Sequence, residues 1–169
     1  LRRRGDKDKV DYVEWEKSGF VVATPGNVID YTAIEQHIRD LCSRFDVREI
    51  AFDPAYSRQI SVPLMEDGFP IVEFRQGWRT MGPAIKELER AIIGRSFRHG
   101  GNPVLRWNFE NIAIQTDSSG NISFHKGKSR DRIDGAVATA MAVARAATGE
   151  SGTSVYNDEN ARPEGLLFI

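Results

Sequence analysis

Apolar residues in this chain follow a helical period in some stretches and form short continuous runs in others. Ile34, Ile38, Leu41 and Phe45 recur at helical spacing, and Asp30 stands where an N-cap is expected. The same pattern predicts further helices over 54–67, 80–95, 103–109 and 132–147. Apolar runs predict strands over 20–24, 48–53, 70–74, 112–116 and 121–125. This alternation of strand and helix predicts an α/β domain.

Turn and breaker residues refine this arrangement. Asp117, Ser118, Ser119 and Gly120 stand between the last two predicted strands, which predicts a β-hairpin. Pro63 lies inside the helix predicted over 54–67 and is expected to break or kink it.

Composition excludes several classes of protein. The chain has 169 residues, of which 40% are hydrophobic, which suits one soluble domain with its own core. Its net charge of −1 gives no global field for nucleic acid, so any such binding must come from local patches. Cys42 is the single cysteine and cannot form an internal disulfide. The longest apolar stretch, 136–144, is too short and too rich in alanine to span a bilayer, and no signal peptide opens the chain.

The two ends of the chain differ from its middle. Residues 1–18 are highly charged and predict an exposed segment that is held through Trp15. The first nine of them are expected to form a loop cut from a longer polypeptide. Residues 149–169 are rich in small and polar side chains, and we expect a flexible tail there, so the predicted domain covers residues 1–148.

Asp53 is the first candidate for chemistry. It ends an apolar run and precedes Pro54, and the carboxyl ends of strands in open α/β sheets commonly carry functional residues. The same pair also suits the start of a helix, with Asp as the N-cap and Pro as the first helical residue. On local spacing, both interpretations stay open, and the helix cap is the more common one.

A second acidic cluster far downstream supports a catalytic interpretation. Asp134 opens the last predicted helix, and Asp131 lies three residues earlier, on the same helix face if the helix begins early enough. Asp53 and Asp134, brought together, could hold Mg²⁺ or Mn²⁺, which take hard oxygen ligands and promote phosphoryl transfer. Asp131 is the reserve ligand.

A basic run precedes this cluster. It consists of Lys126, Lys128, Arg130 and Arg132. Such a run is commonly a solvated loop, but next to a metal site it could hold the phosphodiester backbone of DNA without reading bases. The sequence has no phosphate-binding loop, nucleophile elbow or dinucleotide fingerprint, and so no ATPase motor of its own.

Several motifs, in order, resemble the C-terminal nuclease domain of the large terminase subunit of tailed bacteriophages. They cover roughly residues 10–148 and are 12–15 (YVEW), 24–31 (TPGNVIDY), 52–54 (FDP), 99–107 (HGGNPVLRW) and 132–138 (RIDGAVA). The resemblance implies a ribonuclease H-like mixed sheet flanked by helices, and cleavage of concatemeric viral DNA with two divalent metals. It assigns Asp53 to the end of the central strand and Asp134 to the start of the last helix.

The resemblance also implies features beyond this chain. The family's first catalytic aspartate lies on an opening strand for which no match is found here, so the domain is expected to lack its first strand and to be poorly active. The implied partners are double-stranded DNA, an N-terminal ATPase domain, the small terminase subunit and the portal, in the cytoplasm of an infected or lysogenic bacterium. The alternative is a non-catalytic DNA-binding or docking module of the packaging motor.

Overall fold

A computed structural model describes residues 1–26, 28–55, 57–125 and 127–150, with the backbone only at Glu150. The elements are, in order, α1 (Arg2–Asp8), α2 (Tyr12–Lys17), α3 (Tyr31–Arg44), β1 (Ile50–Phe52), α4 (Arg58–Glu66), β2 (Ile71–Glu73), α5 (Trp78–Ile93), α6 (Pro103–Glu110), β3 (Ile114–Thr116), β4 (Ile122–Phe124) and α7 (Asp134–Glu150). The α/β class predicted from the sequence is confirmed.

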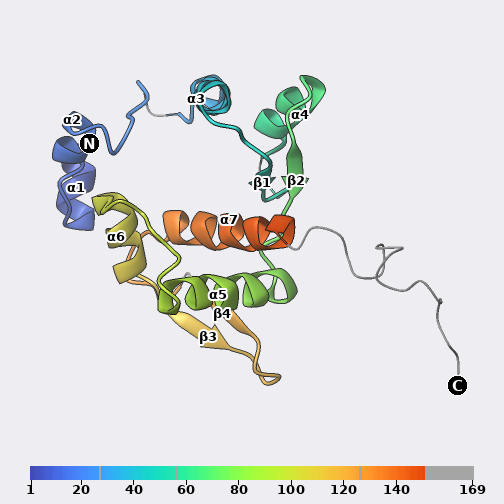
Figure 1. Cartoon of the computed structure of the whole chain (residues 1–169). Helices are drawn as coiled ribbons and strands as arrows, with labels where there is room; N and C mark the ends of the chain where they lie inside the picture. The colour runs from blue at the N-terminus through green and yellow to red at the C-terminus, as the bar shows by residue number, and fades with distance from the viewer. Residues whose placement is uncertain (27, 56, 126, 151–169) are drawn as a thin grey trace, which may run out of the picture.

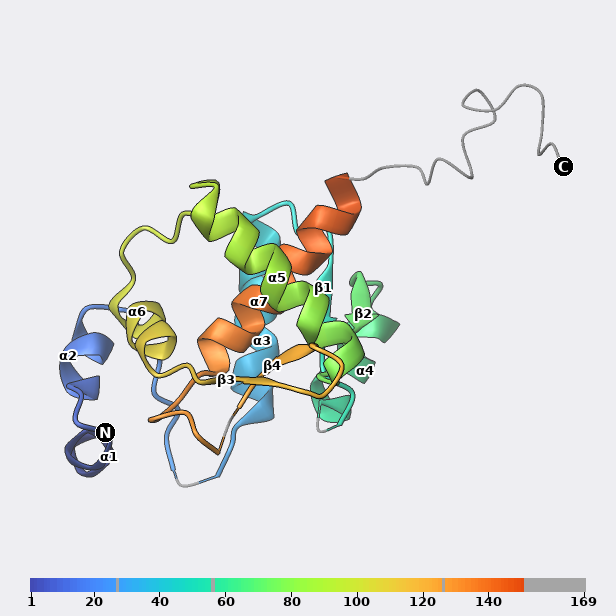
Figure 2. The ribbon, with the colours of Figure 1, turned by 90° about the horizontal axis from the view of Figure 1, so that it is seen from below.

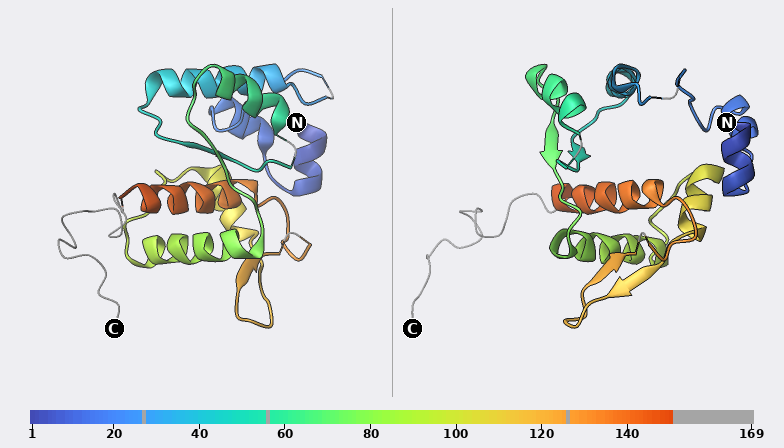
Figure 3. Two further views of the ribbon diagram at one scale, coloured as in Figure 1. Left: turned by 90° about the vertical axis from the view of Figure 1, so that its right-hand side faces the viewer. Right: turned by 180° about the vertical axis from the view of Figure 1, so that it is seen from behind.

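Two long helices, α5 and α7, lie side by side at the centre (Figure 1). The hairpin β3–β4 projects from the α5 side, whereas β1, β2, α3 and α4 lie on the α7 side (Figures 1 and 3). The three remaining helices, α1, α2 and α6, gather near the amino-terminal end of α7 (Figures 1 and 2). Segments from both halves of the chain therefore surround the start of α7.

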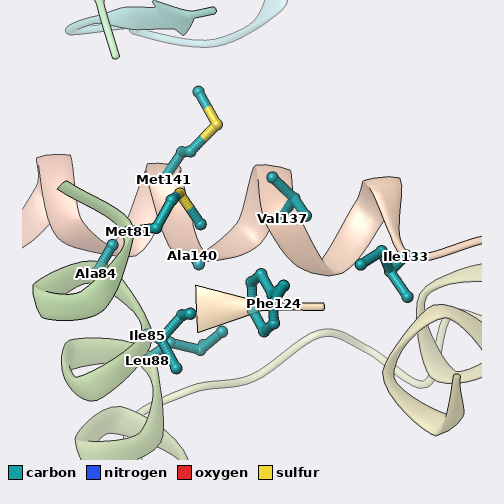
Figure 4. Close-up of a cluster of buried hydrophobic side chains, with 9 residues drawn as sticks. All are labelled: Met81, Ala84, Ile85, Leu88, Phe124, Ile133, Val137, Ala140 and Met141. Carbon is teal, nitrogen blue, oxygen red and sulfur yellow. The ribbon is translucent and has the colours of Figure 1, made fainter. Parts of the chain in front are cut away.

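The hydrophobic core lies between α5, α7 and the hairpin. Phe124 of β4 points in between the two helices, and Ile133 closes the cluster just before α7 (Figure 4). Ala136 and Ala140 are completely buried, because small side chains let α7 lie close to its neighbours. The cluster consists of Met81, Ala84, Ile85, Leu88, Phe124, Ile133, Val137, Ala140 and Met141. This core fixes α7, the helix that carries Asp134.

The strands form two separate two-stranded sheets. β1 and β2 are parallel, with Ala51 opposite Val72, and β3 and β4 are antiparallel, with Gln115 opposite Ser123. Within the described residues, the single mixed sheet expected from the sequence is therefore not formed. Each strand is only three residues long, shorter than the apolar runs that predicted it.

Side-chain caps begin two helices, one of them at Asp30, as predicted from the sequence. Asp30 accepts a hydrogen bond from the backbone N–H of Ala33 at 3.0 Å and begins α3. Asn102 accepts one from the N–H of Leu105, also at 3.0 Å, and begins α6 with Pro103 in its first turn. The helix predicted over 80–95 is confirmed as α5, which begins at Trp78. The last predicted helix is confirmed as α7, which begins two residues later than expected.

The prediction for the first nine residues is wrong. They form α1 instead of a loop, and this helix ends at Lys9 in a left-handed conformation with φ of 54°. A hydrogen bond and ion pair from Arg4 to Asp8, one helical turn apart, stabilises a charged sequence as a helix. The expectation for Trp15 is confirmed, because its ring lies 5.7 Å from that of Trp107 on α6.

The strand predicted over 20–24 is also wrong. The segment has no strand assignment, and Val22 is 75% exposed. The backbone N–H groups of Phe20 and Val21 both donate to the carbonyl of Trp15, which turns the chain at the end of α2 instead of extending it. Strand preference of apolar residues depends on a neighbouring strand, and none pairs with this segment among the described residues.

Pro63 does not break its helix. α4 runs through it to Glu66, and the N–H of Asp67 donates to the Pro63 carbonyl at 3.1 Å, so the helical turn continues beyond the proline. At the other end, α7 includes Gly149 and Glu150, which were expected to start the tail. The rest of that predicted tail, 151–169, lies outside the described residues. None of the described helices is long and apolar enough to cross a bilayer.

Candidate metal and nucleic-acid site

Asp53 directly follows β1 and is half-buried. Its Oδ1 accepts a hydrogen bond from the N–H of Ala55 at 3.0 Å, and its carbonyl accepts one from the Ser57 hydroxyl. The residue therefore closes a tight turn, and α4 begins only at Arg58 with Ser57 as its N-cap. The alternative in which Asp53 caps that helix is wrong.

Asp134 is the first residue of α7 and is exposed. The first hydrogen bond of the helix runs from the N–H of Val137 to the carbonyl of Ile133, at 3.0 Å. Ile133 is buried and has no polar side chain to cap the helix. A carboxylate in the first turn interacts favourably with the exposed N–H groups there.

Asp131 does not share a helix face with Asp134. It lies in a bend before α7, and its Oδ1 accepts a hydrogen bond from the N–H of Arg132 at 2.9 Å. The hydrogen bond with Asp8 raises the pKa of Arg4, and burial with a hydrogen bond to Asp8 raises the pKa of Tyr12, whereas the charge of Asp131 adds only a small part to either. The helix-face argument for Asp131 as a reserve ligand is therefore wrong, because the helix begins after it.

The course of β1 along α7 relates the two main candidates. Glu49, just before β1, is paired with Arg145 near the end of α7, at 2.6 Å. Further along β1, Ala51 shares a groove of about 760 Å³ with Ala138 and Met141. β1 thus runs in the direction opposite to α7. Asp53 directly follows β1 and therefore lies toward the amino-terminal half of the helix. Convergence of Asp53 and Asp134 on one cation stays a prediction.

Among the described residues, no three Asp, Glu, His or Cys side chains come close enough together to hold a metal ion. Asp53 and Asp134 have suitable oxygen donors, and neither forms an ion pair within the described part of the chain. Two carboxylates fit part of a Mg²⁺ or Mn²⁺ site but do not complete a two-metal site.

The basic segment before α7 is exposed, and hydrogen bonds from its backbone hold it in place. The N–H of Lys128 donates to His125 Nδ1 at 3.0 Å, and the N–H of Arg130 donates to the carbonyl of Asn111 at 3.1 Å. Lys128, Arg130 and Arg132 are exposed, and Arg132 Nε lies 3.9 Å from Asp131 Oδ1 in an ion pair. Lys126, the fourth predicted member, lies outside the described residues.

An open pocket of about 480 Å³ lies beside the start of α7. Arg132 and Asp134 both line it, together with Phe20 and Asn108. A cationic and an anionic side chain thus border one open pocket, and arginine is a side chain that commonly contacts phosphate. This pocket unites two of the predicted site residues.

Sequence reasoning missed two buried asparagines, Asn108 on α6 and Asn111, the residue that caps the carboxyl-terminal end of α6. Asn108 and Asn111 are 4% and 7% exposed and bind the backbone around Asp134. Their partners lie more than 20 positions away. The signal in the sequence is weak, because it consists of two asparagines three positions apart, at and just beyond the end of a short helix.

An α/β domain with carboxylates at a strand end and a helix start defines a class of proteins that includes metal-dependent nucleases. A family model described as "Terminase large subunit, endonuclease domain" matches residues 2–150. The large terminase subunit of Enterobacteria phage HK97 is 36% identical over 152 residues, or 89% of this chain and 30% of that protein. Protein YmfN of Escherichia coli K12 is 31% identical over 137 residues, covering 80% and 30%.

A solved structure agrees with these sequence matches. The crystal structure of the HK97 bacteriophage large terminase superimposes with a TM-score of 0.79 and 35% identity, over 86% of this chain and 31% of that one. The chain belongs to the terminase large subunit endonuclease domain family. It spans less than one third of the length of the relatives described here.

Proposed function

We propose that this chain is the part of a large terminase subunit that cuts viral DNA during genome packaging, as a divalent-metal-dependent endonuclease with a ribonuclease H-like arrangement. The observation that carries the proposal is the family match over residues 2–150, with Asp53 at the end of a strand and Asp134 at the start of a helix. Both are positions where α/β domains place chemistry.

In this proposal, Asp53 and Asp134 each contribute carboxylate oxygen to a Mg²⁺ or Mn²⁺ site. When bound, the metal activates water and stabilises the leaving oxygen of the phosphodiester. Because two carboxylates are too few for two cations, a two-metal site needs further acidic ligands from outside the described residues. Asp131 remains a reserve ligand only if its bend rearranges.

The basic residues take the role of holding DNA. Lys128, Arg130 and Arg132, with Lys126, neutralise backbone phosphates near Asp134 and read no bases. Non-specific binding suits an enzyme that must cut many sequences. In the whole protein, the proposed partners are an ATPase domain, the small terminase subunit and the portal, in the cytoplasm of an infected or lysogenic bacterium.

The test measures cleavage of supercoiled plasmid DNA by the whole large terminase subunit in the presence of Mn²⁺. Asp53→Asn and Asp134→Asn should each abolish cutting, with a decrease of at least about 100-fold, while the circular dichroism spectrum stays unchanged. Glu89→Gln, which neutralises an exposed carboxylate on α5, should cut like the wild type. Normal cutting by either aspartate variant would reject the proposed roles.

Cleavage, gel retardation and a crystal soak together separate the alternative of a non-catalytic DNA-binding module. That alternative predicts that the wild-type protein retards DNA on a gel without cutting it at any Mn²⁺ concentration. It also predicts that crystals soaked in Mn²⁺ show no ion at Asp53 or Asp134.

A further inference from the structure

Asn108 is a buried polar side chain that joins α6 to the start of α7. Its Oδ1 accepts a hydrogen bond from the backbone N–H of Gly135 at 2.7 Å, and its Nδ2 donates to the carbonyl of Val104 at 3.0 Å. The residue is 4% exposed. Both ends of its amide are therefore satisfied, one by its own helix and one by α7.

The start of α7 needs such a partner. The first N–H groups of any helix lack acceptors within the helix, and a Ser, Thr, Asp or Asn at the N-cap commonly supplies one. Here the residue before the helix is Ile133, which cannot. Asn108 supplies the acceptor from another element, 27 positions earlier in the sequence.

Gly135 permits this contact. A Cβ atom at this position would lie 3.2 Å from Asn108 Oδ1 and 3.3 Å from Leu105 Cδ1, closer than side chains ordinarily approach. Glycine therefore lets α7 come near enough to α6 for a hydrogen bond of normal length. The residue directly after Asp134 thus serves the approach of the two helices.

Asn111, three residues after Asn108, makes a second contact with the segment around Asp134. Its Nδ2 donates to the carbonyl of Arg132 at 3.2 Å, and its own carbonyl accepts from the N–H of Arg130. The two asparagines thus bind the backbone on either side of Asp134, at positions 132 and 135. A segment fixed at both sides has little freedom to change the direction in which the carboxylate projects.

We infer that Asn108 and Asn111 are positioning residues for Asp134: they fix the turn that presents its carboxylate to the cation. The inference rests on the proposed function for the metal, but the hydrogen-bonding part can be measured without metal. Neither asparagine has to touch cation or DNA to act in this way.

The experiment uses the full 169-residue chain in three variants. Asn108→Ala removes the acceptor for the Gly135 N–H. Asn108→Asp keeps an oxygen acceptor for that N–H but loses the donor to the Val104 carbonyl, so it tests the acceptor alone. Leu64→Val trims a buried side chain on α4, remote in sequence from both asparagines, and controls for general destabilisation.

The first readout is hydrogen exchange at the Gly135 amide, followed by NMR without metal. Asn108→Ala should speed this exchange about tenfold beyond any change in global stability, because one buried hydrogen bond is lost. Asn108→Asp should exchange more slowly at Gly135 than Asn108→Ala, after correction for global stability, because the acceptor is kept. Leu64→Val should change Gly135 no more than other core amides. Unchanged exchange in Asn108→Ala would overturn the inference.

The second readout is Mn²⁺ binding, followed by paramagnetic broadening of the amide signals of residues 133–136. Asn108→Ala should lower the affinity at least about threefold, and Leu64→Val should leave it unchanged. Equal affinity in Asn108→Ala and wild type would overturn the positioning role. If the wild type shows no broadening at these amides while Gly135 exchange responds as expected, the proposed metal site fails and the helix-start contact stands.

Discussion

Glu49 and Arg145 form a two-point ion pair between elements that are 96 positions apart. Arg145 Nε donates to Glu49 Oε2 at 2.6 Å and Nη2 donates to Oε1 at 2.8 Å, and each side chain is about one third exposed. This pair holds the start of β1 against the carboxyl-terminal part of α7. It therefore sets the direction in which β1 leads to Asp53.

The pair predicts a specific pH dependence of stability. The hydrogen bond from Arg145 holds the pKa of Glu49 below its ordinary value of 4.5. A depressed carboxylate pKa adds stability above pH 4.5, and this contribution disappears as the pH falls through the lower, folded-state pKa. Glu49→Gln should lower the melting temperature by about 1–3 °C at pH 7, and less at 1 M salt, because an exposed pair is screened.

Thermal unfolding of wild type and Glu49→Gln across pH 3–7 tests this prediction. The two melting temperatures should converge at the acidic end of the range. A constant difference at every pH would show that the change acts through packing and not through charge.

A second pH effect is predicted at the amino-terminal helices. Burial, reinforced by the hydrogen bond from its hydroxyl to Asp8, raises the pKa of Tyr12 to about 12. Since the folded state holds the proton more tightly, the contribution to stability is complete below pH 10 and is lost as the pH rises toward 12.

Ultraviolet titration of tyrosinate can detect this group among the four tyrosines. Wild type should show one tyrosine that ionises later than the others, and Asp8→Asn should lower its pKa. Tyr12→Phe should remove the late step completely. A late step that persists in Tyr12→Phe would assign it to another tyrosine.

Helical elements were predictable because their signals are local. Asp30 and Asn102 cap the helices that follow them, and the apolar face of α5 recurs at regular spacing. The contacts that build the candidate site are not local. Asn108 bonds Gly135, and Glu49 bonds Arg145, and no pattern within a short window reveals either pair.

The errors have a related cause. Residues 20–24 carry strand propensity, but among the described residues no strand lies beside them, so they do not form one. A shared helix face for Asp131 and Asp134 requires a helix that begins before Asp131, whereas α7 begins only at Asp134. Periodicity predicts which elements form more reliably than it predicts where they begin and what they pair with.

Substitution by alanine should change the free energy of unfolding differently at two glycines of α7. A Cβ at Gly135 would contact Asn108 and Leu105, whereas at Gly149 nothing lies within 4 Å. Gly135→Ala should therefore reduce the free energy of unfolding by about 1–2 kcal/mol, because the two helices must move apart. Gly149→Ala should be neutral or stabilise the protein by up to about 1 kcal/mol, through higher helix propensity. Urea denaturation of both variants measures the difference, and equal effects would contradict the close approach at Gly135.

The basic segment should contribute to DNA binding without sequence preference. Lys128→Ala with Arg130→Ala should weaken binding evenly across duplex sequences and reduce the salt dependence of log K by up to about two, since each phosphate contact releases counterions. Lys86→Ala with Arg98→Ala removes the same charge from other exposed positions and should change the slope less. Fluorescence anisotropy at several salt concentrations provides the slopes. Equal slopes for the two double variants would show that the segment is ordinary surface charge.

Binding of Mn²⁺ to the 169-residue chain can decide whether Asp53 and Asp134 share one cation. With two carboxylates and no third acidic group beside them among the described residues, the dissociation constant should be about 1 mM or weaker. If both bind the same ion, Asp53→Asn and Asp134→Asn should each remove most of the affinity, and the double variant should lose little more. If they bind separate ions, the losses should add and each single variant should keep one site. Calorimetric titration of all four proteins distinguishes these outcomes, and additive losses would reject the shared site on which the proposed nuclease activity depends.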